Sequence, residues 1–135
     1  KPSTCNGDLR MKSPQPVIRV TMMPRDTNGH GTIFGGVLLS YIDQAGAIEA
    51  VRHVKQKIVT VAIKEVVFHH PVHVGDVVSF FGSVKRKGRT SITVAVEVFA
   101  ARMMTGCEEE VKVTEAELTF VAIDDDGNPV PYERE

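Results

Sequence analysis

The chain has 135 residues, with 16 Lys or Arg against 17 Asp or Glu, and 42% of its residues are hydrophobic. This length suits one domain that buries roughly two thirds of its unfolded surface, and it excludes separate cofactor and substrate domains. The net charge of −1 argues against nucleic acid or a membrane surface as a partner, because such binders carry a basic excess. Cys5 and Cys107 are expected to be free thiols in the reducing cytoplasm.

The N-terminal part predicts a leader, a strand and a loop. Residues 1–15 are polar and lack a hydrophobic period, so we expect a flexible leader before a single domain over residues 16–135. Val17–Met23 predicts a short strand that Pro24 ends. Arg25–Gly36 contains four glycines, which adopt turns that other residues resist, and predicts a loop.

A long helix is predicted from Gly36 to about Val54, where apolar residues recur at steps of three and four. Further apolar residues lie off that face, so we expect other structure to cover most sides of the helix. Asp43, Gln44 and Glu49 interrupt the apolar stretch, a pattern that suits a buried helix of a soluble protein better than a membrane span.

The remainder of the chain is β in character. Lys57–His70 is a β-branched run whose apolar parity changes, which predicts a bulge near Lys64 and Glu65. The later strands and turns are expected at Val77–Lys85, Lys87–Arg89 (a hairpin turn), Thr90–Arg102, Thr105–Glu110 (a turn) and Val111–Ile123. This order predicts an α+β fold in which a curved five-stranded antiparallel sheet, joined mostly by hairpins, wraps the one helix.

Asp43 is the first candidate for chemistry. Its neighbours one helical turn away are Leu39, Ser40, Gly46 and Ala47, so no local cation pairs with it. Partial desolvation of a carboxylate raises its affinity for protons, which makes Asp43 a candidate base or nucleophile. The alternative is an acid on the helix surface that reaches solvent or a distant base.

The glycine-rich loop delivers Gly35 and Gly36 to the start of the helix. Backbone N–H groups and the positive end of the helix dipole there favour a bound or developing negative charge. The spacing matches neither a Walker A motif nor a dinucleotide fingerprint, and a turn needed only for tight packing stays an alternative.

These two features lie far apart in one helix. Gly36 and Asp43 are separated by about 10 Å along the axis. An attacking group and an oxyanion donor both lie within about 3 Å of a reacting centre. If both residues act, the helix start of one chain meets Asp43 of another, so at least a dimer is required.

Two weaker patterns remain. Four cations at positions 85–89, followed by two hydroxyls, could hold phosphate groups, although a solvated basic turn is the plainer interpretation. His69, His70 and His73 lack a Cys or carboxylate that would complete a ligand set, so no metal site is predicted. His30 lies in the glycine loop, where a histidine that caps or packs is the expected interpretation.

Several motifs in order resemble one family. Asp26-Thr27-Asn28, Gly31, Phe34-Gly35-Gly36 and Asp43 are similar to the acyl-CoA thioester hydrolases of the hot dog fold. The resemblance runs from about Thr21 to Tyr132. It also includes Thr60-Val61, Pro71-Val72-His73-Val74-Gly75-Asp76 and Lys87-Gly88-Arg89-Thr90-Ser91.

The resemblance implies a helix in a five-stranded antiparallel sheet, dimers that join two sheets, trimers of dimers, and sites at the dimer interface. By position, Asp43 would be the catalytic carboxylate, Asn28 its polar partner, and Gly36 the oxyanion donor beside Gly35. Thr60 would lie near the carboxylate. The path of CoA would be lined by Lys87, Gly88, Arg89, Thr90 and Ser91.

The implied activity is hydrolysis of acyl-CoA to free acid and CoA, with no cofactor apart from CoA itself as part of substrate and product. A thiol with a pKa of about 8.5 leaves without a strong general acid, which suits so small a catalytic set. Two alternatives stay open. One is a hot dog dehydratase or hydratase that pairs His30 with Asp43, and the other is a non-catalytic acyl-CoA-binding module.

Overall fold

The computed structural model describes residues 15–29, 31–64, 66–102 and 110–132. Its elements in chain order are β1 (Ile18–Thr21), the 3-10 helix η2 (Pro24–Asp26), α2 (Gly35–Val51), β2 (Lys57–Lys64), β3 (Asp76–Lys87), β4 (Ser91–Arg102) and β5 (Glu110–Ile123). Outside the described residues lie Cys5, His30, Cys107, almost all of the predicted leader and most of the predicted turn at Thr105–Glu110.

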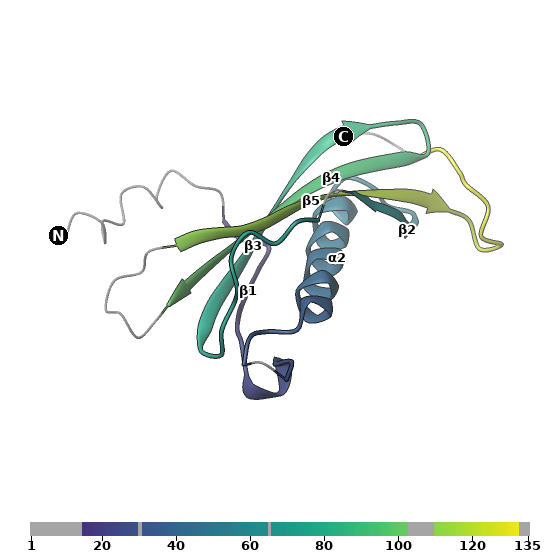
Figure 1. Cartoon of the computed structure of the whole chain (residues 1–135). Coiled ribbons are helices and arrows are strands. Elements are labelled where there is room, and N and C mark those ends of the chain that lie inside the picture. The colour runs from purple at the N-terminus through teal and green to yellow at the C-terminus, as the bar shows by residue number, and fades with distance from the viewer. Residues whose placement is uncertain (1–14, 30, 65, 103–109, 133–135) are drawn as a thin grey trace.

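The five strands form one antiparallel sheet in the order β1-β3-β4-β5-β2. Figure 1 shows the sheet curling around one side of α2, the only helix of more than one turn among the described residues. The predicted α+β fold, with a curved five-stranded antiparallel sheet around one long helix, is confirmed. Because β2 pairs with β5 and not with β3, the chain crosses from one edge of the sheet to its interior after β2.

The core lies between the sheet and the helix. In β4, Ile92, Val94, Val96 and Val98 alternate toward the helix and are at most 1% exposed, because successive side chains of a strand point to opposite faces. The helix supplies its own buried face through Leu38, Ile42, Ala45, Gly46 and Ala50.

Two predicted boundaries shift by a few residues. The helix begins at Gly35 and ends at Val51 rather than Val54, because the next residues form a terminal turn in which the amides of His53 and Val54 both donate to the Ala50 carbonyl. The third strand is longer than predicted, since β3 covers Asp76–Lys87.

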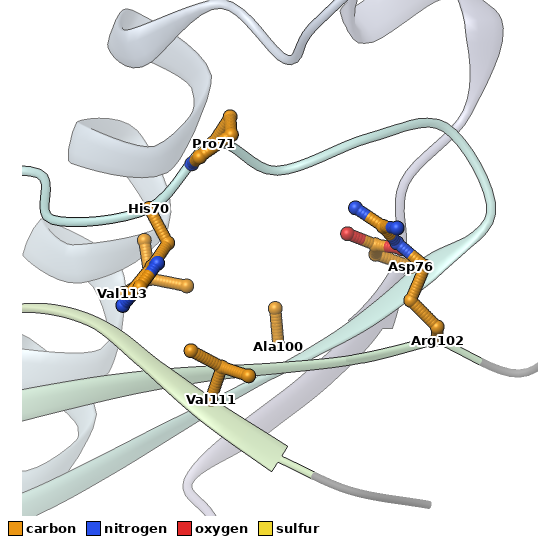
Figure 2. A pocket seen from close by; sticks show the side chains of 7 residues that line it. All are labelled: His70, Pro71, Asp76, Ala100, Arg102, Val111 and Val113. Atoms are coloured by element: carbon orange, nitrogen blue, oxygen red, sulfur yellow. The ribbon is translucent and has the colours of Figure 1, made fainter. Parts of the chain in front are cut away.

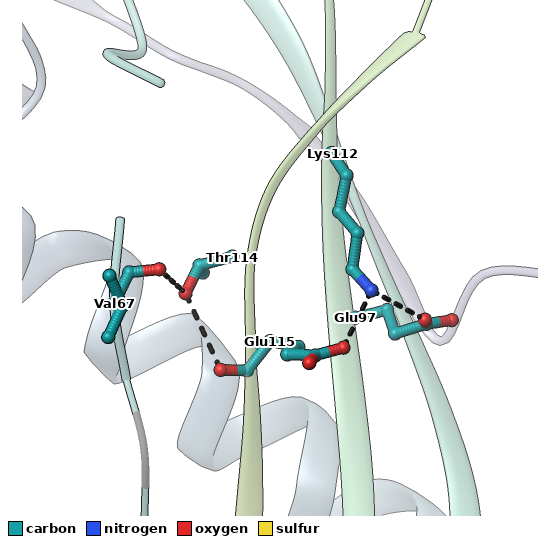
Figure 3. Close-up of polar contacts among 5 residues, drawn as sticks. All are labelled: Val67, Glu97, Lys112, Thr114 and Glu115. Atoms are coloured by element: carbon teal, nitrogen blue, oxygen red, sulfur yellow. Dashed lines mark hydrogen bonds and ion pairs between the residues drawn. The ribbon is translucent and has the colours of Figure 1, made fainter. Parts of the chain in front are cut away.

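The predicted bulge and the predicted strand over Lys57–His70 are wrong in detail. The register of β2 against β5 shifts between Thr60 and Ala62, earlier than the expected position at Lys64 and Glu65, of which Glu65 lies outside the described residues. The regular strand ends at Lys64, and beyond it the chain is held to β5 by isolated contacts. The Thr114 hydroxyl donates to the Val67 carbonyl at 2.6 Å (Figure 3), and the His69 amide donates to the Val113 carbonyl at 2.8 Å.

One side of the helix and one edge of the sheet lie open in the single chain. Ile48 and Val51 of α2 are 42% and 53% exposed and belong to the single exposed stripe of the helix, whereas its other sides are buried or half-buried, as expected. The neighbouring edge strand β2 exposes Val59, Val61 and Ile63. No helix in the described ranges is long and apolar enough to span a membrane.

Candidate active site

The loop before α2 folds into a small hairpin that fixes the start of the helix. The Phe34 amide donates to the Asp26 carbonyl at 2.8 Å, and the Asn28 amide donates to the Thr32 carbonyl at 2.9 Å. Gly31 has a φ of 87°, a left-handed conformation that glycine adopts without steric cost. The loop is therefore a regular, hydrogen-bonded hairpin rather than an irregular connection.

Asn28 lies near the tip of this hairpin. Its side-chain Nδ2 donates to the Thr32 hydroxyl at 3.0 Å, so its amide orientation is fixed locally. The hairpin docks on the segment before β3, where the Ile33 amide donates to the Val72 carbonyl at 2.8 Å. Asn28 and the first turn of α2 are consequently parts of one anchored unit.

The first turn of α2 presents the amides of Gly35 and Gly36, which have no acceptor within the helix. Phe34 occupies the N-cap position and gives no side-chain hydrogen bond to these amides. A Cβ on Gly36 would lie 2.7 Å from Cε2 of Phe34, so any larger residue would have to push this exposed ring aside. The helix start can thus receive a ligand oxygen on its backbone amides.

Asp43 and Thr60 form the second part of the candidate site. The Thr60 hydroxyl donates to Asp43 Oδ1 at 2.7 Å. Thr60 is paired with the core residue Phe120 of β5, which directs its side chain toward the helix. Asp43 is half-buried, and no ion pair involves it among the described residues.

The structure places these two parts in one chain but not together. Gly36 and Asp43 lie on the same outward side of α2, two turns apart, which separates them by about 10 Å along the axis. A single thioester carbonyl cannot contact both within one subunit.

The hairpin Lys87–Ser91 lies at the other end of the molecule from the helix start. The Gly88 amide donates to the Ser91 carbonyl at 2.8 Å and closes the turn. The Tyr132 hydroxyl donates to the same carbonyl at 2.6 Å and ties the turn to the C-terminal segment. Since β3 begins beside the helix start and runs 12 residues to Lys87, Arg89, Thr90 and Ser91 are not brought near Gly36 in one chain.

Asp76 is a polar residue of the resemblance motif Pro71–Asp76, and the sequence predicted no role for it. It is 3% exposed and accepts from the Arg102 Nε at 2.9 Å and the His73 amide at 3.0 Å. Its position directly after Gly75, at a strand start, was the available signal. Asp76 lines a cavity of about 250 Å³. The side chains that line this cavity, shown in Figure 2, are His70, Pro71, Asp76, Ala100, Arg102, Val111 and Val113.

A charged cluster on β4 and β5 lies apart from these residues. The Lys112 ammonium lies 2.6 Å from Glu115 and 3.0 Å from Glu97 (Figure 3). Its hydrogen bonds to Glu115 and then to Glu97 raise the pKa of Lys112, and the hydrogen bond from Lys112 lowers the pKa of Glu115. In the described parts of the chain, no three His, Cys, Asp or Glu side chains gather as metal ligands.

Comparison with known proteins identifies the class to which this fold and site belong. Residues 30–107 match the family described as the Thioesterase superfamily. This range contains the glycines of the helix start, Asp43, Thr60 and the Lys87–Ser91 hairpin. The chain belongs to the Thioesterase superfamily.

Particular relatives are similar over most of their length. The acyl-CoA thioester hydrolase YciA of Salmonella typhimurium is 40% identical over 116 residues, which cover 85% of this chain and 87% of that protein. A hexameric hotdog fold thioesterase of Campylobacter jejuni superposes with a TM-score of 0.83 at 42% identity, covering 89% and 91% of the two chains. An acyl-CoA hydrolase from Staphylococcus aureus, solved in complex with butyryl coenzyme A and coenzyme A, has a TM-score of 0.78 at 32% identity, covering 87% and 70%.

Proposed function

We propose that this protein is an acyl-CoA thioesterase that hydrolyses acyl-CoA to a free carboxylic acid and CoA. The observation that carries the proposal is the pairing of Asp43 with the Thr60 hydroxyl at 2.7 Å, on the outward side of a helix that begins with Gly35 and Gly36. The names of the similar proteins, which include acyl-CoA thioester hydrolases, support the same reaction.

The proposed reaction needs few groups. A water oxygen bonds to the acyl carbon, the C–S bond breaks, and the sulfur leaves as a thiolate that requires no strong acid. The Gly36 amide would donate to the oxyanion, while Asn28 would orient water or the carbonyl. Asp43 would either remove a proton from water or attack the carbonyl itself and form an anhydride that water then cleaves.

We propose that each site forms between two subunits. The separation of about 10 Å between Gly36 and Asp43 in one helix supports a site that combines Gly36 of one subunit with Asp43 of the partner subunit. The open edge of β2, with Val59, Val61 and Ile63 exposed, supports a dimer in which this edge is covered. The hexameric relatives support three such dimers in one assembly.

The Lys87–Ser91 hairpin is proposed to hold the phosphate groups of CoA. Its charges and hydroxyls suit phosphate, and its distance from the helix start matches a long substrate rather than a short one. Acyl-CoA and water balance the reaction, so no metal or redox cofactor is part of the proposal. The proposal also keeps the cytoplasmic location expected from the sequence, which fractionation of expressing cells would test.

Thiol release from acyl-CoA tests the proposed function. Purified protein is incubated with acetyl-, butyryl-, octanoyl- and palmitoyl-CoA, and free CoA is measured with a thiol reagent with and without EDTA. We expect release from at least one substrate, unchanged by EDTA. Enoyl-CoA hydration without thiol release would support the dehydratase alternative, and binding without any turnover would support the binding module.

A further inference from the structure

The part of the chain between β1 and α2 is attached at both of its ends to one turn at residues 72–76. At the first end, the Met22 amide donates to the Asp76 carbonyl at 2.9 Å. At the second end, the Ile33 amide donates to the Val72 carbonyl at 2.8 Å. Met22, Ile33 and Val72 are at most 6% exposed, so both attachments lie in the core. The position of the 72–76 turn therefore determines the position of the first turn of α2.

The side chain of Asp76 holds this turn with both of its carboxylate oxygens. Oδ2 accepts from the His73 amide at 3.0 Å, within the turn itself. Oδ1 accepts from the Arg102 Nε at 2.9 Å, at the end of β4, the central strand of the sheet (Figure 2). This Asp76–Arg102 brace fixes the turn both internally and to the sheet.

The contact between Arg102 and Asp76 also supplies charge. The Asp76 side chain is 4% exposed, and its pair with Arg102 is its one ion pair among the described residues. Removal of the cation would leave a buried carboxylate without a countercharge, which disfavours the packed position of that carboxylate. Arg102 thus stabilises the arrangement in which Asp76 holds the His73 amide.

Small shifts of this turn would matter for thioester hydrolysis. Gly36 follows Ile33 by only three residues. An amide stabilises an oxyanion only at hydrogen-bonding distance, and a displacement of about 1 Å can lower a rate about 100-fold. We propose that Asp76 and Arg102 are positioning residues that hold the Gly36 amide in place for the reaction. This inference rests on the proposed thioesterase function.

The Asp76–Arg102 brace serves one part of the candidate site. Asn28 lies between the two attachments and belongs to the same anchored unit as Gly36. Asp43 and Thr60 are held by their own hydrogen bond at 2.7 Å, and their side chains share none with the 72–76 turn among the described residues. Loss of the brace is therefore expected to impair the helix start and to leave the Asp43 carboxylate in place.

Steady-state kinetics on the acyl-CoA that the wild type hydrolyses fastest test the proposal. We expect Arg102→Met to lower kcat between about 10-fold and 100-fold and to change KM by less than about twofold, because contacts made to the bound substrate stay intact. Arg102→Lys keeps a cation within reach of Asp76 and should recover most of the rate. Asp76→Asn has one acceptor oxygen instead of two and leaves no buried charge unpaired, so it breaks the brace in a second way and should also lower kcat.

Arg19→Met is the matched control. The Arg19 Nε also donates to β3, at the Ser79 hydroxyl oxygen at 2.8 Å, which lies outside the 72–76 turn. Its kcat should equal that of the wild type. Thermal unfolding of each variant, followed by circular dichroism, sets an assay temperature below every unfolding transition, so unfolded protein does not contribute to a loss of rate.

Mixed assemblies test which part of the site the brace serves. Arg102→Met subunits are co-expressed with Asp43→Asn subunits, and each mixed dimer then has one site with an intact helix start and an intact Asp43. About a quarter of wild-type activity should return, since random assortment makes half of the dimers mixed. Arg102→Met with Asn28→Ala should return none, because both changes impair the helix start. A general loss of stability would not distinguish the two mixtures.

Two results would overturn the proposal while the thioesterase function stands. One is a kcat within about twofold of wild type for both Arg102→Met and Asp76→Asn. The other is equal recovery in the two mixtures when Asn28→Ala with Asp43→Asn does recover. A wild-type protein that releases no thiol from any acyl-CoA would overturn both the proposal and the thioesterase function.

Discussion

At the scale of single residues, the contact between Asp43 and Thr60 decides what the carboxylate is free to do. The hydroxyl occupies Oδ1 at 2.7 Å and leaves Oδ2 without a hydrogen bond among the described residues. A carboxylate held at one oxygen keeps one orientation, while the other oxygen can contact water or a carbonyl carbon. In the proposed mechanism, Thr60 would therefore act through Asp43, as a positioning residue.

Asp43→Asn is expected to lower kcat for acyl-CoA at least about 100-fold, because an amide neither removes a proton at neutral pH nor attacks a thioester. The amide oxygen still accepts from Thr60, so the fold should persist. Thiol release and circular dichroism of the same sample measure the two effects. Turnover at the wild-type rate would remove Asp43 from the mechanism.

Thr60→Val keeps the shape of the side chain and removes the hydrogen bond to Asp43. A hydrogen bond to a charged group is worth about 1.5–3 kcal/mol, so we expect kcat to fall between about 10-fold and 150-fold with a smaller change in KM. Thr60→Ser should restore the rate, since it restores the hydroxyl. A rate that Thr60→Ser fails to restore would show that the methyl group, and not the hydroxyl, matters.

The cluster around Lys112 predicts a dependence on pH away from the site. Lys112 lowers the pKa of Glu115. The ion pair therefore stabilises the folded state at pH values above the ordinary pKa of a glutamate, and this stabilisation is lost as the pH falls through the lowered pKa. Lys112→Met should raise the pKa of Glu115 toward 4.5, as measured by NMR titration of its side-chain carboxyl. Lys55→Met, at an exposed lysine outside the cluster, is the control and should leave that titration unchanged.

At the scale of elements, α2 approaches the sheet closely because small residues face it. A Cβ on Gly46 would lie 3.1 Å from Cζ of Phe120 and 3.4 Å from Cδ1 of Leu118. Both partners are at most 1% exposed and cannot move into solvent. The distance between α2 and β5 in turn sets how far Asp43 lies from Thr60.

Gly46→Val should therefore lower the free energy of unfolding by about 1–3 kcal/mol through overpacking, even though valine shields the helix backbone from water better than glycine does. Thermal unfolding followed by circular dichroism measures the change. Gln44→Val places the same β-branched residue at an exposed position of the same helix, and we expect a much smaller effect. Equal effects of the two substitutions would attribute the loss to helix propensity instead of packing.

The hydrophobic pattern of the sequence predicted the strands correctly where one face of the strand is buried in the core. The alternation of Ile92, Val94 and Val96 identifies β4 because these side chains fill the core. The bulge in β2 was misplaced because that strand is exposed along almost its whole length, so its hydrophobic pattern carries little information on register. The direct contact of Asp43 with Thr60 depends on this register, and only the family resemblance implied that Thr60 lies near the carboxylate.

At the scale of the whole molecule, the two parts of the candidate site belong to two subunits in the proposed dimer. Each chain would contribute Asn28 and Gly36 to one site and Asp43 to the other. The two-fold axis of the dimer would relate two equivalent sites, and neither site would be complete in a monomer. The basic Lys87–Ser91 hairpin, at the end opposite the helix start, suits a substrate that extends across the assembly.

Mixing two impaired variants tests this arrangement. Subunits with Asn28→Ala and subunits with Asp43→Asn are co-expressed with different tags, and mixed dimers carry one site with both residues intact. Random assortment makes half of the dimers mixed, so about a quarter of wild-type activity should return. Pairing Asp43→Asn with the double variant Asn28→Ala/Asp43→Asn should restore none. A mixture no more active than its parts would place each complete site within one chain.

The open edge of β2 also has a consequence for how the protein is made. A strand with free backbone groups on one side and exposed Val59, Val61 and Ile63 is a template for pairing with any extended chain. In a newly folded subunit, assembly with a second subunit thus competes with aggregation, and the rates of both processes rise with protein concentration. Refolding yield should pass through a maximum at intermediate protein concentration, where assembly is fast enough to hide the edge and aggregation has not yet taken over.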